Sequence, residues 1–117
     1  MGTVNEEAVA LYEAAMSLSR RALAGRHYAV AYHELAAGLH AAFDLGDDER
    51  LRAVEDECQE QQMWLNGHDP RHELSGESAA NRGTRSLWEM LREDAERRRQ
   101  ILDRKWRIQH MRSNADP

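Results

Sequence analysis

The sequence is short of several residue types, and each shortage excludes a class of protein. A single cysteine, Cys58, excludes an internal disulfide framework. Its helical spacing from Leu51, Val54 and Leu65 predicts a small buried core residue instead. Only two prolines occur, one of them the last residue, so helices can run long. Runs of alternating β-branched residues are also missing, and no segment predicts a strand.

Long apolar runs are missing as well. No stretch is long enough to span a bilayer. Residues 1–25 carry three glutamates where a signal peptide has a basic start followed by an apolar run. We therefore expect a cytoplasmic protein with no membrane contact. Lysine is nearly absent, since Lys105 is the only one beside fifteen arginines. This bias is typical of GC-rich genomes, so we expect a bacterial source.

What the chain does contain favours helices. Hydrophobic residues make up 41% of it, and alanine and leucine, both strong helix formers, supply much of that share. A chain of 117 residues has room for one domain with one core. We expect an all-α fold with the architecture of a four-helix antiparallel bundle. The predicted domain spans 1–112, with helices at about 4–24, 27–45, 48–65 and 86–111, an irregular segment at 67–85 and a disordered tail at 113–117.

Local signals set these boundaries. Thr3–Glu6 fits a capping box, in which a hydroxyl and a carboxylate each satisfy an unpaired amide at a helix start. Gly25 and Gly46 are placed where a left-handed residue ends a helix. Asn66–Gly67 predicts the end of the third helix. Asp69–Pro70 could cap a short helical turn, because proline suits the first helical position.

The second predicted helix is apolar nearly all round. One side carries the main apolar stripe, and the opposite side is apolar too because it carries valine and alanines. This pattern is typical of a helix inside a bundle. We therefore place this helix at the centre. The stripe consists of Tyr28, Tyr32, Leu35, Leu39 and Phe43.

Small residues alternate with large ones along residues 14–46, at Leu18, Ser19, Ala22, Gly25, Tyr28, Ala31, Tyr32, Leu35, Gly38 and Leu39. These residues give the segment a resemblance to a tetratricopeptide-type helical hairpin, a family whose helix pairs pack tightly through such alternation. The resemblance implies helical hairpins with a long C-terminal helix as an alternative architecture. It also implies a protein-interaction scaffold without catalysis.

A polar line crosses the second helix. His33, His40 and Asp44 share one side at spacings of seven and four residues. If they face an interhelical space, they could line a small-ligand pocket or bind a metal together with helix 3 carboxylates such as Glu55 and Glu60. The competing interpretation is that both histidines sit at the edge of the core. Bundle metal sites usually show Glu-x-x-His on paired helices, and that motif is missing.

Other possible chemistry is weaker. His68 and His72 have the spacing of a helical metal pair, but Pro70 between them predicts a loop. No metalloprotease, phosphate-loop or nucleophile-elbow motif occurs. We therefore expect no catalytic residues and no cofactor, and an enzyme is the less favoured class.

Charge is distributed unevenly along the chain. Residues 1–96 hold nine arginines and nineteen acids, whereas residues 97–112 hold seven cations and one acid. Such a basic helix could bind nucleic acid, but the acidic remainder would repel the same polyanion. A solvated face is one interpretation, and a surface for a protein partner or a second copy is the other. We expect a protein-interaction or self-association module whose contact residues are Arg98, Arg99, Arg104, Lys105, Trp106 and Arg107.

Overall fold

The computed structural model describes the backbone of residues 2–115 and the side chains of residues 5–111. Within that range the chain forms five helices and no strand, which confirms the all-α prediction. The helices are α1 (Gly2–Ala24), α2 (Tyr28–Asp44), α3 (Asp48–His68), α4 (Gly76–Asn81) and α5 (Leu87–Ala115).

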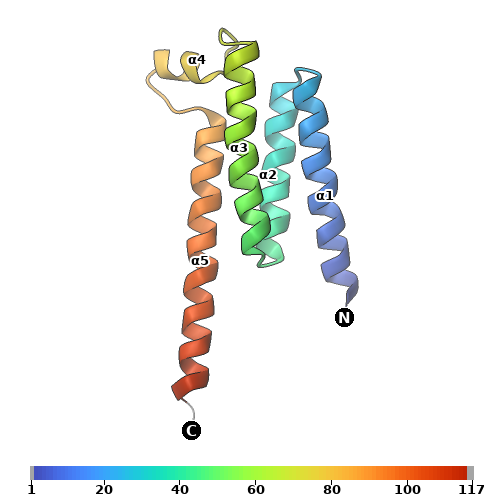
Figure 1. Ribbon diagram of the computed structural model, residues 1–117, viewed down its shortest axis with the longest axis vertical. Helices are drawn as coiled ribbons and strands as arrows, with labels where there is room; N and C mark the ends of the chain where they lie inside the picture. The colour runs from blue at the N-terminus through green and yellow to red at the C-terminus, as the bar shows by residue number, and fades with distance from the viewer. Residues whose placement is uncertain (1, 116–117) are drawn as a thin grey trace.

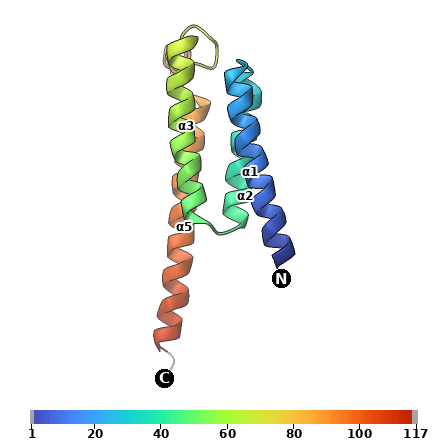
Figure 2. The ribbon, with the colours of Figure 1, turned by 45° about the vertical axis from the view of Figure 1, so that its right-hand side comes forward.

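The four long helices alternate in direction along the chain, and the short α4 lies near the end of α3 (Figure 1). α1 packs on α2, and α3 packs on α5. α2 contacts all three other long helices, as its apolar circumference predicts. The folded chain is flat, with extents of 61 × 33 × 15 Å along its principal axes. The end of α5 projects well beyond the other helices (Figure 2). In the described part of the chain, no helix is both long and apolar enough to cross a membrane.

The core is built from the inward stripes of α2, α3 and α5. Leu35, Leu39, Leu51 and Trp88 are all fully buried. α1 joins this core closely at Gly38, where an added Cβ would lie 2.9 Å from the sulfur of Met16. A larger residue at position 38 would require the Met16 side chain to move, so the small residue allows α1 and α2 to pack closely here.

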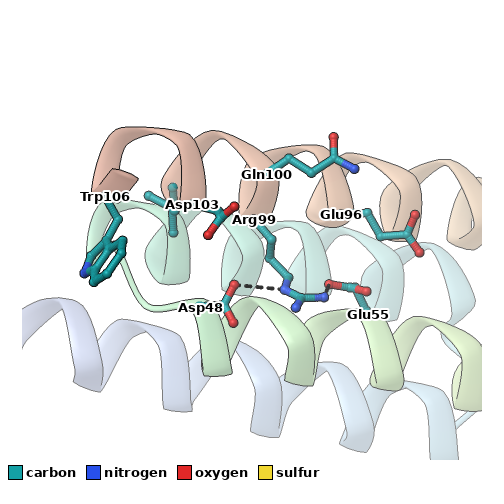
Figure 3. Close-up of a pocket in the computed structure, with 9 residues that line it drawn as sticks. Asp48, Glu55, Glu96, Arg99, Gln100, Asp103 and Trp106 are labelled. Carbon is teal, nitrogen blue, oxygen red and sulfur yellow. Dashed lines mark hydrogen bonds and ion pairs between the residues drawn. The ribbon is translucent and has the colours of Figure 1, made fainter. Parts of the chain in front are cut away.

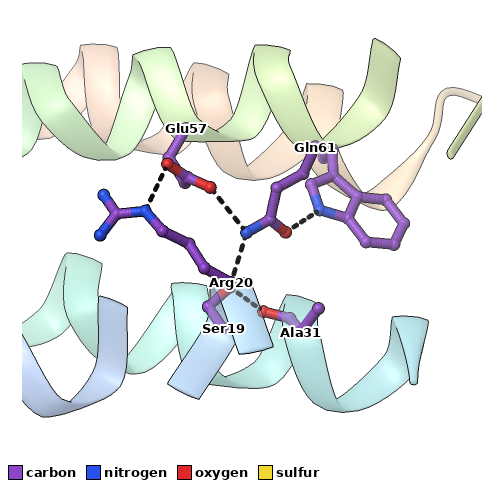
Figure 4. A network of polar contacts seen from close by, with 6 residues as sticks. Ser19, Arg20, Ala31, Glu57 and Gln61 are labelled. Atoms are coloured by element: carbon purple, nitrogen blue, oxygen red, sulfur yellow. Dashed lines mark hydrogen bonds and ion pairs between the residues drawn. The ribbon is translucent and has the colours of Figure 1, made fainter. Parts of the chain in front are cut away.

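A polar network crosses the apolar core (Figure 4). Gln61 of α3 is fully buried, and its amide nitrogen donates to Ser19 Oγ of α1 at 2.8 Å and to Glu57 Oε2 at 3.0 Å. The indole nitrogen of Trp88 on α5 donates to Gln61 Oε1 at 3.0 Å. Ser19 Oγ in turn donates to the carbonyl of Ala31 on α2 at 2.7 Å. Gln61 thus links α3 directly to α1 and α5, and Ser19 extends the network to α2.

The two predicted helix-ending glycines behave differently. Gly46 has φ +65° and ends α2 as predicted. After α1 the left-handed residue is Arg26 (φ 64°), one position beyond Gly25. The amide of Arg26 donates to Leu23 O, and the next amide donates back to Ala22 O. This is the Schellman pattern, and its hydrogen bonds hold a non-glycine residue in a conformation it rarely adopts.

The predicted end of the third helix was wrong. α3 runs through Asn66–Gly67 to His68 because a glycine costs only about 1 kcal/mol inside a helix and buried Leu65 anchors the last turns. The predicted irregular segment 67–85 contains α4. That helix begins after Ser75, whose Oγ accepts from the Ser78 amide at 3.1 Å, and not at Pro70.

The remaining boundaries concern the two ends of the chain. Residues 113–115 continue α5, where the sequence predicted a disordered tail. Asp116 and Pro117 lie outside the described residues. α1 is helical from Gly2, but the predicted cap at Thr3 rests on a side chain outside the described residues.

Candidate functional site

The C-terminal helix changes character along its length. Its first half is anchored by Trp88, Leu91 and Ala95, which are buried against the body. Every residue from 103 to 111 is exposed, and we call residues 103–111 the free segment. The name refers to exposure and not to a lack of contacts, since Gln109 and other residues of this segment have partners. It carries three large apolar side chains, Trp106, Ile108 and Met111, which are 58%, 49% and 70% exposed. The free segment is therefore available to a partner.

Arg99, one of the six predicted contact residues, is used inside the chain. Its Nε donates to Asp48 Oδ1 at 3.0 Å, and its Nη1 donates to Glu55 Oε2 at 2.9 Å (Figure 3). These two hydrogen bonds raise the pKa of Arg99, so the guanidinium stays charged. The ion pairs fasten the middle of α5 to the start of α3.

Arg98 also contacts its own chain. Its Nε lies 3.3 Å from Asp94 Oδ1 one turn earlier, and its guanidinium lies 4.7 Å from the ring centre of Phe43 on α2. A cation over an aromatic face is attracted by the ring quadrupole. Arg98 thus fastens α5 to α2, much as Arg99 fastens it to α3.

The other four predicted contact residues lie in the free segment. Arg104, Lys105, Trp106 and Arg107 are all exposed. Arg107 forms an ion pair with Asp103 at 3.2 Å within the helix. The ring of Trp106 stacks on that of His110 at 3.7 Å. Such exposed intrahelical contacts are weak and leave these side chains open to a partner.

A cavity of about 620 Å³ lies where α5 leaves the start of α3 (Figure 3). Carboxylates surround a single guanidinium there, and an indole lies at one end. The charged and aromatic residues that line the cavity are Asp48, Glu55, Glu96, Arg99, Asp103 and Trp106. The described residues include no group of three or more His, Cys, Asp or Glu that could hold a metal ion. The cavity is thus an acidic groove beside the basic free segment.

The structure places His33, His40 and Asp44 on the exposed side of α2. This position is at odds with the alternative in which they line an interhelical space. The buried stripe containing Leu35 and Leu39 occupies the other side of the helix. Of the helix 3 acids that could have joined them, Glu55 pairs with Arg99. The structure does not bring a ligand set together around these three residues.

The second histidine pair is also separated. His68 stacks on Trp64 at 3.8 Å, whereas His72 packs edge-on against Tyr28 at 4.7 Å. The Tyr28 hydroxyl donates to Asp69 Oδ2. Burial, reinforced by this hydrogen bond, raises the pKa of Tyr28 to about 12. These aromatic contacts close one end of the bundle.

Sequence reasoning missed an apolar surface on α5. Met90 and Ile101 are 46% and 40% exposed and lie on the same side of the helix as Ile108 and Met111. The signal was present in their spacings of eleven, seven and three residues. This apolar spacing is hard to recognise in the sequence because arginines and an aspartate occupy the positions of the same face that lie between these residues.

Comparisons with known proteins give no family for this chain. No protein-family model, no curated protein and no solved structure matches it. The tetratricopeptide-type resemblance of residues 14–46 therefore stays a prediction.

Proposed function

We propose that this protein is an interaction module that self-associates through α5. The observation that carries the proposal is the free segment, in which Trp106, Ile108 and Met111 are exposed among cations. Scattered apolar residues are ordinary on a protein surface, but a cluster of large ones often marks a binding site. The tetratricopeptide-type resemblance supports the same class of function.

Charge supports a second copy as the partner. Residues 97–112 have a net charge of +6, and residues 1–96 have a net charge of −10. Arg98 and Arg99 are held against the body, whereas Arg104, Lys105 and Arg107 are exposed. Of these three, Arg107 pairs with Asp103, and the Lys105 ammonium lies 6.0 Å from the ring centre of Phe43. A second copy offers these cations an acidic surface. A nucleic acid would gain the same cations but meet repulsion from the acidic body.

Charge reversal in the free segment should reduce self-association. We expect the wild-type chain to show a mass above 13.5 kDa by light scattering at low salt, and that mass to fall as salt is added. The double variant Arg104→Glu/Arg107→Glu should stay near the monomer mass under the same conditions. It replaces attraction with repulsion where the free segment meets an acidic partner.

The control is Arg52→Glu/Arg71→Glu. Both arginines are exposed and lie outside α5, and the change in net charge is the same. This variant should keep the wild-type mass. A wild-type mass of one chain at every concentration and salt would disprove self-association, and an equal effect of both double variants would disprove the role of α5 in it.

A further inference from the structure

One face of α5 is at least partly exposed from residue 90 to residue 111. It includes Met90, Asp94, Arg97, Ile101, Arg104, Ile108 and Met111, whose spacing alternates between four and three residues, and we call it the outward face. α2 and α3 lie against other sides of α5, through Arg98 and Arg99. At about 1.5 Å per residue, the face runs about 32 Å from its first methionine to its last. An apolar face repeated every three to four residues is the pattern that pairs helices.

The charge of α5 changes sign along this length. Residues 87–96 hold four acids and one arginine, whereas residues 97–112 hold seven cations and one acid. A parallel pair of such helices would place like charges side by side. An antiparallel pair places the acidic half of each helix against the basic half of the other, which favours that orientation.

We propose that two copies of the chain pair antiparallel through the outward faces of their α5 helices, with the two-fold axis near residue 99. This inference rests on the proposed self-association and specifies its geometry. The register places Met90 against the partner's Ile108, and Asp94 against the partner's Arg104. It also places the aliphatic stem of Arg97 beside the partner's Ile101. Because the arrangement is symmetric, every one of these contacts occurs twice.

Side chains on the outward face are available for these contacts. Asp94 is 33% exposed although it pairs with both Arg97 and Arg98, and Arg97 is 64% exposed. Met90 and Ile108 are about half exposed, at 46% and 49%. Pairing would bury this apolar surface in both copies. It would also leave the groove beside Trp106 uncovered, because that groove opens between α5 and α3.

A charge swap tests the register. Asp94→Arg and Arg104→Asp should each raise the dissociation constant of the dimer at least about tenfold, because each places like charges opposite one another twice. The double variant Asp94→Arg/Arg104→Asp restores opposite charges in an antiparallel pair only. We expect its dissociation constant to return to within about threefold of the wild-type value, as in a double-mutant cycle. Sedimentation equilibrium gives these constants.

Two further variants separate this inference from the proposed function. Ile108→Asp should abolish the dimer and leave the helical circular dichroism unchanged, because Ile108 lies in the free segment. The matched change Val30→Asp, at an apolar residue of α2 that is 52% exposed, should leave the dissociation constant unchanged. A dimer that survives Ile108→Asp, or a charge swap without rescue, overturns the antiparallel register while self-association stands. A monomeric wild type overturns both.

Discussion

Trp88→Ala is expected to lower the free energy of unfolding by about 3–5 kcal/mol, the cost typical of removing a large buried aromatic side chain. Trp88 is fully buried, and it packs edge-on against Tyr32 at a centroid distance of 5.8 Å. Its removal also takes away the indole N–H that donates to Gln61. The variant therefore leaves a cavity and an unpaired amide oxygen in the core. Urea denaturation below the self-association concentration measures the change.

Trp106→Ala is the matched control, because both residues are tryptophans on α5. Trp106 is 58% exposed, so its removal should change the free energy of unfolding by no more than about 0.5 kcal/mol. A similar loss of stability in the two variants would contradict the burial of Trp88 and the exposure of Trp106 on α5.

Gln61→Leu is expected to cost about 2–4 kcal/mol, although leucine fills a similar volume. The loss comes from the groups that stay behind. Glu57 Oε2 loses its amide donor in a site where only 8% of the residue is exposed, and the Trp88 N–H loses its acceptor. Arg20 still pairs with the other oxygen of Glu57 at 3.0 Å, which limits the penalty. Chemical denaturation again gives the value.

Gln59→Leu provides the comparison, since Gln59 is exposed on the same helix. Its effect should be within about 0.5 kcal/mol of zero. The effects of Gln61→Leu and Trp88→Phe should also be less than additive in the double variant, because both remove the same hydrogen bond. Full additivity would contradict the network in Figure 4.

The sequence predicted those parts of the fold that depend on local pattern. The stripe through Leu35 and Leu39 gave the central position of α2. Gly46 gave the end of that helix, because its positive φ is easy for glycine. Helical periodicity predicted the buried position of Cys58, where burial raises the pKa of the thiol to about 12.

Contacts between distant residues were not predictable in the same way. Gln61 looks like any polar residue of an acidic helix, and only tertiary packing shows that it meets Ser19 and Trp88. Periodicity placed His33 on a helix apolar nearly all round, but could not show which side faced the neighbouring helices. Similarly, the basic run identified Arg99 as exposed charge, although its partner Asp48 lies 51 residues earlier.

The most direct test of the antiparallel α5 pair is the distance between spin labels on two chains. A label at His110→Cys reacts selectively, because Cys58 is buried with a raised pKa. With the axis near residue 99, two labels at position 110 are separated by about 33 Å along the helices, and two labels at Gln100→Cys by about 3 Å. A long distance at 110 together with a short one at 100 is the predicted result. Short distances at both positions, or no dipolar coupling at either, would contradict it.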